Sequence, residues 1–371
     1  MNKKIIVFAN TSWFLFNFNL NLMLHLQKLG YEVVAVAPED DYSARFAEYG
    51  ISFKAITIDN KGTNPIKDAL LFVRLVFLFI KQKPACILSY TSKSNIYASL
   101  AARLLHIPVI NNISGLGTAF IREDWVTKIV KWLYRLSLNK SSKVFLLNED
   151  DLAIFINNNL VQTEKTELLP GPGVDVNQFS PSDKSNHNKN FVFLLVARML
   201  KDKGIVELVE ATRLLKAQYP YIECQLLGFL DAKNPSAVSS EEMQAWVNEG
   251  VVNYLGVSDS VVDFLRLADC VVLPSYREGV PRSLLEAASV GKPIITTDAV
   301  GCREVVDDGI NGFLCEPRSV SDLKDKMEKM LLLPETERLQ MGYNGRDKVL
   351  KQFDEQIIID RYVKAIEHLY S

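Results

Sequence analysis

The stretch C-V-V-L-P-S-Y-R-E-G-V-P-R-S-L-L-E, residues 270–286, contains a strand, a turn and the start of a helix. Cys270–Leu273 is a short apolar run typical of a buried strand, and the helix opens within Glu278–Glu286. Pro281 suits the first helical turn, because the N–H that proline lacks would have no partner there. The remaining N–H groups of this turn, together with Gly279, predict an anion site that carries the partial positive charge of the helix.

Two glutamates accompany this turn. Glu278 lies just before the helix, and Glu286 lies about one and a half turns inside it. Ser283 and Glu286 are three residues apart and share a helix face, so a phosphate and a diol could be held side by side. The alternative is a capped structural helix with two solvated glutamates, which the spacing alone does not exclude.

A second stretch of the same kind is R-M-L-K-D-K-G, Arg198–Gly204, which directly follows the expected strand Phe191–Ala197. A strand followed by a turn and a helix puts Arg198 and Lys203 at the carboxyl edge of the sheet. Arg198 offers a planar fork and Lys203 a point charge, and two cations there would neutralise a diphosphate. The alternative is a solvated turn with ordinary surface lysines. This alternative becomes less favoured when the turn is paired with the acidic helix start at Glu278, which follows a neighbouring strand.

Short apolar runs alternate with helical patterns along the chain, which predicts parallel sheets covered on both faces. The expected strands are Lys4–Ala9, Glu32–Ala37, Ser52–Ile58, Ala85–Ser89, Pro108–Ile113, Lys143–Leu147, Phe191–Ala197, Ile222–Leu227, Val251–Leu255, Cys270–Leu273, Pro293–Thr297 and Gly312–Cys315. The expected helices are Asn19–Leu29, Ile66–Gln82, Ser94–His106, Trp125–Leu138, Ile205–Lys216, Glu241–Glu249, Ser260–Ala268, Pro281–Val290, Ser321–Leu332, Thr336–Lys351 and Asp354–Tyr370.

The segment Leu169–Asn190 interrupts this alternation with closely spaced prolines and glycines and then a polar run, which is linker composition. We therefore expect an α/β protein of two doubly wound, Rossmann-like domains that face each other across a cleft. Ligands should bind in that cleft, at the carboxyl ends of the strands. The expected boundaries are 1–180 for the N-terminal domain, 181–352 for the C-terminal domain and 353–371 for a closing helix.

Composition excludes several classes of protein. The 371 residues are 48% hydrophobic and 23% charged, which excludes wholesale disorder. The 42 Lys+Arg against 44 Asp+Glu give a net charge of −2, which argues against nucleic-acid binding. The apolar run Ile5–Ala9 is too short for a signal peptide, and Ala69–Ile80 contains Arg74 and is too short to cross a bilayer. We expect a cytoplasmic protein with no nucleic-acid partner.

The C-terminal motifs resemble glycosyltransferase family 4, retaining enzymes of the GT-B fold that use nucleotide-sugar donors. The resemblance rests on Arg198 and Lys203, on the E-x7-E spacing of Glu278 and Glu286, and on the linker G-P-G-V-D ending at Asp175. It implies that Glu286 binds the donor ribose, that Glu278 addresses the transferred sugar, and that both cations hold the diphosphate. The implied catalytic residues are Arg198, Lys203 and Glu278. The implied donor-binding residues are Gly256, Gly279, Val280, Pro281, Arg282, Ser283 and Glu286.

The N-terminal half resembles a narrower group of these enzymes, which builds O-antigen, capsular or glycan repeat units on undecaprenyl diphosphate. The matching stretches are Y-T-S-K-S-N-I-Y-A-S-L-A-A-R-L from Tyr90 and N-I-S-G-L-G-T-A-F ending at Phe120. Many relatives carry prolines beside the lysine, where this chain has Ser92 and Ser94. The family fold also implies a closing helix that crosses back onto the N-terminal domain. The acceptor-side residues that we expect are Asn17, Lys93, Ser94, Asn95, Gly115 and Gly117.

We expect neither a metal nor a cofactor. No two aspartates are separated by one residue, so the chain has no D-x-D motif of the type that holds a divalent ion on a donor diphosphate. Helix N–H groups with Arg198 and Lys203 would supply the positive charge instead. Some family 4 enzymes place a histidine in the N-terminal half near the reacting sugar. None of the four histidines of this chain matches that position: His25, His106, His187 and His368.

The segment Arg122–Lys143 combines basic and aromatic residues, with six Lys+Arg against two acidic residues. Its aromatic residues are Trp125, Trp132 and Tyr134. Such a helix suits anionic lipid headgroups, so we expect peripheral contact with the inner face of the plasma membrane. The alternative is an ordinary amphipathic helix that Ile129, Leu133 and Leu136 pack onto the sheet.

We therefore expect a retaining, metal-independent transferase that moves a hexose or N-acetylhexosamine from a nucleotide sugar, with UDP as the expected nucleotide, to a lipid-diphosphate-linked glycan. Two alternatives stay open: a nucleotide-sugar epimerase, and a non-catalytic nucleotide-sugar-binding subunit of a polysaccharide assembly complex. A dinucleotide-dependent dehydrogenase is disfavoured, because no strand is followed by G-x-G-x-x-G. Gly115 and Gly117 begin that pattern, but Phe120 stands at its last glycine.

Overall fold

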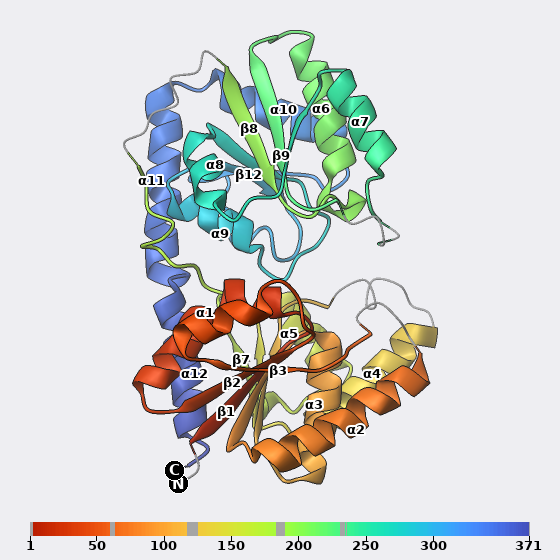
Figure 1. Ribbon diagram of the computed structural model, residues 1–371. Coiled ribbons are helices and arrows are strands. Elements are labelled where there is room, and N and C mark those ends of the chain that lie inside the picture. Colours follow the sequence, from red (N-terminus) through yellow and green to blue (C-terminus); the bar gives the residue numbers. More distant parts are fainter. Residues whose placement is uncertain are drawn as a thin grey trace. The chain divides into compact units, whose positions relative to one another are not determined.

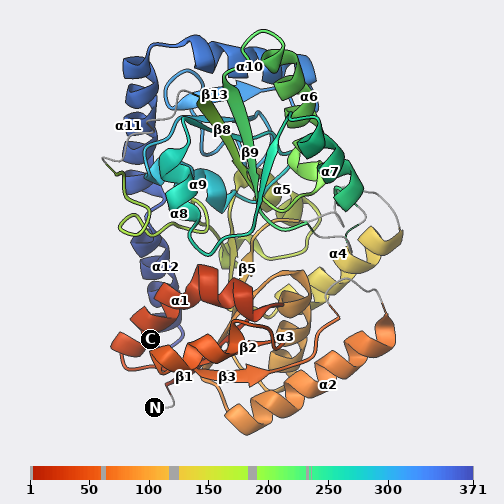
Figure 2. The ribbon, with the colours of Figure 1, turned by 45° about the horizontal axis from the view of Figure 1, so that its top comes forward.

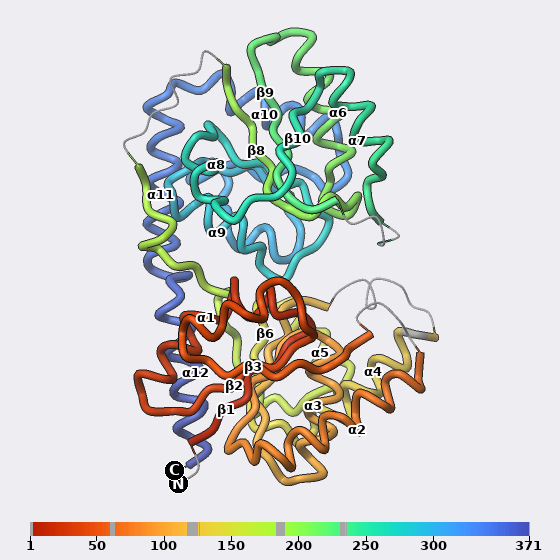
Figure 3. The backbone as a smooth tube through the Cα atoms, in the orientation of Figure 1, coloured from red at the N-terminus to blue at the C-terminus, as the bar shows by residue number. Residues whose placement is uncertain are grey.

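The structure, a computed structural model, describes residues 3–59, 64–116, 125–182, 190–230, 234 and 236–370. Contacts divide the chain into two units. Unit 1 comprises Met1–Leu169 and Ile358–Ser371, and unit 2 comprises Pro170–Ile357. The last segment of the chain therefore returns to the N-terminal unit, and its path can be followed in Figure 3.

The described residues of unit 1 contain seven strands, all paired in parallel, in the order β3-β2-β1-β4-β5-β6-β7. The strands are β1 (Lys4–Phe8), β2 (Glu32–Ala37), β3 (Ser52–Ala55), β4 (Cys86–Tyr90), β5 (Val109–Ile113), β6 (Lys143–Leu146) and β7 (Thr166–Leu168). The helices are α1 (Ser12–Lys28), α2 (Pro65–Gln82), α3 (Ser92–Leu104), α4 (Trp125–Leu138), α5 (Glu149–Asn157) and α12 (Glu355–Glu367), with short 3-10 helices η1 (Ser43–Tyr49) and η3 (Thr163–Lys165).

Helices α2, α3 and α4 lie side by side on one face of this sheet, with α3 in the middle (Figures 1 and 2). Two neighbouring residues of β5 place α12 on the opposite face. Asn111 Nδ2 donates to Asn95 Oδ1 of α3 at 2.9 Å, whereas Asn112 Nδ2 donates to Tyr362 Oη of α12 at 2.8 Å. Successive side chains of a strand point to opposite faces, so α12 covers the face that α3 leaves open.

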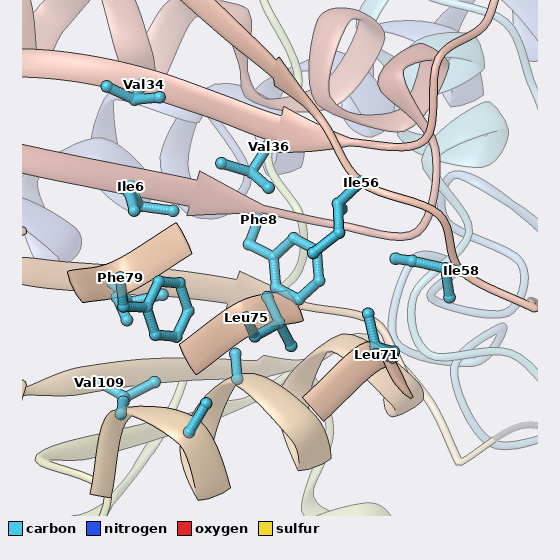
Figure 4. Close-up of a cluster of buried hydrophobic side chains, with 14 residues drawn as sticks. Ile6, Phe8, Val34, Val36, Ile56, Ile58, Leu71, Leu75, Phe79 and Val109 are labelled. Carbon is cyan, nitrogen blue, oxygen red and sulfur yellow. The ribbon is translucent and has the colours of Figure 1, made fainter. Parts of the chain in front are cut away.

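One buried cluster of unit 1 lies between the sheet and α2 (Figure 4), and a second gathers around Tyr134 of α4 and Phe155 of α5. Ile6 and Phe8 of β1 are fully buried in the first cluster, against α2. Leu71, Leu75 and Phe79 are spaced four residues apart, so they share the face of α2 that meets the sheet. Burial of each such side chain contributes about 1.5–3 kcal/mol to the free energy of unfolding.

The described part of unit 2 contains six strands in a second parallel sheet, in the order β10-β9-β8-β11-β12-β13. The strands are β8 (Phe191–Val196), β9 (Ile222–Leu227), β10 (Asn253–Gly256), β11 (Cys270–Leu273), β12 (Ile294–Thr297) and β13 (Gly312–Cys315). The helices are η4 (Lys201–Lys203), α6 (Ile205–Lys216), α7 (Ser240–Asn248), α8 (Val261–Leu267), α9 (Arg282–Ser289), α10 (Val320–Leu332) and α11 (Glu335–Gln352). Helix α10 packs on α6, and α11 packs on α9.

The predicted α/β class with two doubly wound parallel sheets is confirmed. Three local features differ from the prediction. Strand β7 and helix α5 were not expected, and α1 begins at Ser12 rather than at Asn19. The earlier start has a physical cause, because Thr11 Oγ1 accepts from the N–H of Phe14 at 3.1 Å and Asp40 Oδ2 accepts from the N–H of Ser12 at 2.9 Å. These acceptors satisfy the first N–H groups of the helix.

Candidate active site

Two turns at the carboxyl ends of neighbouring strands form the predicted C-terminal site. β8 and β11 pair in parallel, so the turns that follow them lie at the same edge of the sheet. The first turn leads through η4 into α6, and the second leads into α9. The N–H of Tyr276 in the second turn donates to the carbonyl of Asp202 in the first at 3.0 Å. This backbone bond fixes the two turns against each other.

Lys203 and Glu278 meet across these turns. Lys203 Nζ forms a hydrogen-bonded ion pair with Glu278 Oε1, and Ser275 Oγ donates to the same oxygen at 2.6 Å. The two side chains are 18% and 14% exposed, so the pair is mostly shielded from water but keeps a surface that a ligand can reach. Partial burial strengthens the attraction between the charges, and the carboxylate is therefore held in one place.

Two glycines permit this close approach. Gly204 has a φ of +71°, and a Cβ there would lie 2.1 Å from the carbonyl oxygen of Pro274, in the turn that carries Glu278. Gly301 has a φ of +85°, and a Cβ there would lie 2.4 Å from the carbonyl oxygen of Glu278 itself. A side chain at either position would displace the Glu278 turn.

Arg198 lies at the same sheet edge, directly after β8, and its side chain is exposed. Its guanidinium makes no ion pair with any residue that the structure describes. The sheet edge therefore carries a solvated cation together with the shielded pair of Lys203 and Glu278. A planar guanidinium in such a place is suited to bind phosphate oxygens through two hydrogen bonds.

The remaining predicted residues of unit 2 occupy three places. Gly279 and Val280 lie in the turn between Glu278 and α9, where Val280 is buried and can offer only its backbone to a ligand. Gly256 ends β10, two strands away from β8, so it lies at the same sheet edge but about 10 Å along it. Ser283 lies in the first turn of α9 and is partly exposed.

Helix α9 starts directly after the Glu278 turn. Pro281 is its N-cap residue rather than part of its first turn, and no side chain caps the helix there. Arg282, the first residue of α9, donates from Nε to Oε1 of Glu286 one turn on at 3.1 Å, and both side chains are mostly buried. Burial raises the pKa of Glu286, and the neighbouring Arg282 offsets only part of that rise.

Ser275 and Tyr276 belong to this site although the sequence motifs did not single them out. Tyr276 Oη donates to Glu207 Oε1 of α6 at 2.5 Å, and the guanidinium of Arg318 lies 4.6 Å from the centre of its ring. These contacts tie the Glu278 turn to α6. The position of Ser275, directly after a strand and three residues before Glu278, was the available signal.

In unit 1, Lys93 lies at the start of α3, at the carboxyl end of β4. Its Nζ pairs with Asp68 Oδ1 of α2 at 2.7 Å, and Tyr97 Oη donates to the other oxygen of Asp68 at 3.0 Å. Thr91, just before α3, has a φ of +68°, which is strained for a β-branched residue. Strain of this kind is concentrated at functional sites.

The neighbouring residues Ser94 and Asn95 are buried. Asn95 Nδ2 donates to the carbonyl of Asn112 at 2.8 Å, and Thr91 Oγ1 donates to Ser94 Oγ at 3.2 Å. The Asn95 side chain thus holds α3 to β5, and the Ser94 hydroxyl bonds within the start of α3. Direct contact of either residue with an acceptor stays a prediction.

The other expected acceptor-side residues lie on different elements. Asn17 lies inside α1, where its Nδ2 donates to the carbonyl of Trp13 at 2.9 Å. The sequence placed it in a loop, because the predicted helix began later. Gly115 follows β5 with a φ of +138°, and Gly117 lies outside the described residues.

The cations of the basic segment 122–143 are largely engaged within unit 1. Lys131 Nζ donates to Asn158 Oδ1 at 3.0 Å, and Arg135 donates to the carbonyls of Asn158 and Asn159 at 2.7 and 3.1 Å. Arg135 thus satisfies the carbonyls that follow α5. Lys143 pairs with a glutamate, Glu167, at 2.8 Å. Arg135 stays exposed in spite of these bonds, and contact of this segment with headgroups stays a prediction.

Four exposed side chains, Trp125, Ile129, Trp132 and Leu136, form the apolar surface of α4, with Trp125 and Trp132 68% and 59% exposed. The cations Lys128 and Arg135 are exposed on the same helix. The alternative prediction, that Ile129, Leu133 and Leu136 pack α4 onto the sheet, is wrong for Ile129 and Leu136 and confirmed for Leu133, which packs against the core cluster of unit 1 that includes Val144 and Leu146 of β6. Lys128 and Lys140 are exposed, and Arg122 lies outside the described residues. In the ranges that the structure describes, no helix is both long and apolar enough to span a membrane.

Comparison with known families covers most of both units. Residues 177–348 match the family of glycosyl transferases group 1, and residues 4–148 match the family described as glycosyl transferase 4-like. The chain belongs to glycosyltransferase family 4. Its members are retaining hexosyltransferases, so the predicted enzyme class is confirmed. The two alternatives, an epimerase and a non-catalytic subunit, are therefore excluded.

Two curated relatives resemble the glycosyltransferase over most of its length. N,N'-diacetylbacillosaminyl-diphospho-undecaprenol alpha-1,3-N-acetylgalactosaminyltransferase of Campylobacter jejuni is 29% identical, with 96% of each chain covered. UDP-Gal:alpha-D-GlcNAc-diphosphoundecaprenol alpha-1,3-galactosyltransferase of Escherichia coli is 25% identical, with 82% of this chain and 81% of its own covered. The crystal structure of Anabaena HepE in complex with UDP-glucose matches 98% of this chain and 99% of its own, with a TM-score of 0.82 and 18% identity. The GT-B fold is thereby confirmed.

Proposed function

We propose that this glycosyltransferase moves a hexose or N-acetylhexosamine from a UDP-linked donor to a polyprenyl-diphosphate-linked glycan, in the biosynthesis of a surface polysaccharide or glycan. The observation that carries the proposal is the similarity to the Campylobacter jejuni enzyme over 96% of both chains. That enzyme and the one of Escherichia coli are both named for acceptors on undecaprenol diphosphate. A match over 96% of both chains supports similar roles for the corresponding halves of the two proteins, one for acceptor binding and one for donor binding.

Unit 2 would bind the donor. Arg198 and Lys203 would hold the diphosphate, Glu286 would accept hydrogen bonds from the ribose hydroxyls, and Glu278 would contact the transferred sugar. The uncapped start of α9 supports this assignment, because its N–H groups and partial positive charge suit phosphate oxygens. Gly279, Val280 and Ser283 would add backbone contacts around the sugar and phosphate.

Unit 1 would bind the acceptor, with Lys93 near its diphosphate and Gly115 beside it. Retention needs no protein nucleophile in this scheme. The leaving phosphate takes the acceptor proton on the face from which it departs, while Arg198, Lys203 and α9 stabilise the charge that develops on it. In this scheme the predicted domain 1–180 would bind the acceptor, and the predicted domain 181–352 would bind the donor.

A donor screen tests the proposal. The purified enzyme is incubated with single UDP-sugars and with lipid extract from the source organism, and the lipid-linked product is read by mass spectrometry. We expect one UDP-sugar to add a mass of one hexose or N-acetylhexosamine to a polyprenyl-diphosphate glycan. Transfer from other nucleotide sugars alone, or only to water-soluble acceptors, would refute the proposal.

Removal of divalent metal should leave activity intact. The chain has no D-x-D motif, and two cations and a helix N-terminus stand ready to neutralise the diphosphate. We therefore expect the initial rate in excess EDTA to stay within about twofold of the untreated rate, well under 1 kcal/mol in activation free energy. Complete loss that Mg²⁺ or Mn²⁺ restores would contradict the assignment of the diphosphate charge to Arg198 and Lys203.

Peripheral contact with the inner face of the plasma membrane would run through the apolar surface of α4 defined above, with Lys128 and Arg135 exposed on the same helix. Exposed tryptophans suit the membrane interface, since the ring is apolar and its N–H reaches water. The reversal of Lys131 and Arg135 is a poor test, because it would also disturb the end of α5.

The double variant Trp125→Ser, Trp132→Ser should bind anionic vesicles more weakly. If each ring contributes on the order of 1 kcal/mol through buried apolar area, the partition constant falls at least about tenfold. Co-sedimentation with phosphatidylglycerol vesicles measures it. Tyr343→Ser is the control, since it removes an exposed aromatic ring from unit 2. Equal sedimentation of parent and double variant would show that α4 is not the contact.

A further inference from the structure

An apolar groove of about 1020 Å³ runs across unit 1 between α2 and α4. Figures 1 and 2 show these two helices on either side of α3, which forms the floor of the groove. The volume reaches the upper end of the range of small-molecule sites, about 300–1,000 Å³. The walls are mostly apolar, with Ala69 and Phe72 from α2, Tyr97 and Leu100 from α3, and Ile129 and Leu133 from α4.

The groove has a direction relative to the predicted acceptor site. At one end, Lys93 and Asp68 form their ion pair where α2 and α3 begin, at the carboxyl end of β4. At the other end, Arg103 Nη1 donates to the carbonyl of Leu136 at 3.3 Å, where α3 and α4 end. The groove therefore begins at the edge that carries Lys93 and follows α3 for about 20 Å.

The outer surfaces of both walls are also apolar. On α2 the exposed residues Ile66, Leu70, Val73, Phe77 and Ile80 follow a helical repeat. On α4 the exposed Trp132 and Leu136 lie outside the groove lining. An apolar surface of this extent marks a partner, a membrane or a ligand rather than chance. A hydrocarbon chain that leaves a bilayer at this surface could enter the groove without crossing water.

We propose that this groove binds the isoprenoid chain next to the diphosphate of the lipid-linked acceptor. The inference rests on the proposed function, since an acceptor of that class carries a hydrocarbon beside two phosphates. Lys93 lies at one mouth of the groove, so the diphosphate would stay at the carboxyl edge of the sheet while the chain extends along α3. The walls offer area for dispersion contacts and few polar groups, which suits a hydrocarbon better than a glycan or a peptide backbone.

Acceptors that differ only in their hydrocarbon test the proposal. The same glycan diphosphate is linked either to a polyprenyl chain or to a short n-alkyl chain, and both are assayed in detergent, so that membrane contact plays no part. We expect the parent enzyme to have the lower KM for the polyprenyl acceptor. Ala69→Trp fills the groove from the exposed side of α2 and should reduce this KM ratio about tenfold, as expected when a few buried CH₂ groups are lost.

Lys81→Trp is the matched control, because it adds the same ring to an exposed position of α2 that does not line the groove. It should keep the ratio of the parent. If Ala69→Trp keeps that ratio as well, the groove does not hold the chain, while transfer to both acceptors leaves the proposed function standing. If neither acceptor is glycosylated by the parent, the proposed function itself fails.

Photolabelling needs no glycosyl transfer, so it distinguishes a failure of the groove proposal from a failure of the proposed function. A diazirine-bearing farnesyl diphosphate, which carries no glycan, is photolysed with the protein, and labelled peptides are mapped by mass spectrometry. We expect labels on groove residues such as Phe72, Leu100 and Leu133, and much weaker labelling in Ala69→Trp. Labels confined to the outer residues Phe77 and Trp132, or no labels in unit 1, would overturn the proposal in favour of a membrane or protein surface.

Discussion

Glu278→Ala should lower kcat by about 10²- to 10³-fold, the scale on which a preorganised polar contact to the reacting centre acts. In the structure the carboxylate is held by Lys203 and by the Ser275 hydroxyl, so it is placed before any ligand arrives. In Glu278→Ala the contact to the transferred sugar is missing from the transition state, whereas the contacts to the nucleotide remain. The dissociation constant of UDP should therefore change little.

Steady-state kinetics and calorimetric titration with UDP measure the two effects separately. Glu278→Gln keeps the shape of the side chain and should recover little of the turnover, because the charge that pairs with Lys203 is gone. Glu249→Ala is the control, since it breaks another ion pair of unit 2, with Arg213, away from this turn. Near-normal turnover in Glu278→Ala would remove this residue from the reacting centre.

The second large effect concerns the two cations. Arg198→Ala and Lys203→Ala should each weaken UDP binding about 10- to 100-fold, since a hydrogen bond to a charged group contributes roughly 1.5–3 kcal/mol. Turnover should fall further, by about 10²-fold each, because the charge on the leaving diphosphate grows in the transition state. Uridine lacks the diphosphate, and its affinity should be unaffected.

The two variants should differ in one respect. The side chain of Arg198 is exposed and makes no ion pair with the residues that the structure describes, so its loss should leave Tm nearly unchanged. Loss of Lys203 leaves the mostly buried Glu278 carboxylate without its cation, and this variant should also have a lower Tm. Lys201→Ala is a suitable control, because Lys201 pairs with Glu242 on the surface nearby. Equal loss of UDP and uridine affinity would mean that the cations act through the fold and not through the diphosphate.

The sequence by itself determined the elements and the local chemistry. Strands and helices follow from periodicities that extend over a few residues, so β11, the Glu278 turn and α9 could be predicted from residues 270–286 alone. The same holds for Arg198 and Lys203 after β8. Local acceptors outside the pattern caused the errors at helix starts, such as the caps that extend α1 back to Ser12.

Only the tertiary structure decided which distant segments meet. Lys203 and Glu278 are 75 residues apart, and they touch because the sheet order places β8 beside β11, which no local pattern encodes. The burial of Asn95 follows likewise from its bond to β5. On α4, packing decided which side chains are covered: Tyr134 and Leu138 are buried, whereas Trp125 and Trp132 stay exposed. Lys131 and Arg135 bond to residues just beyond α5, because the carbonyls there need donors.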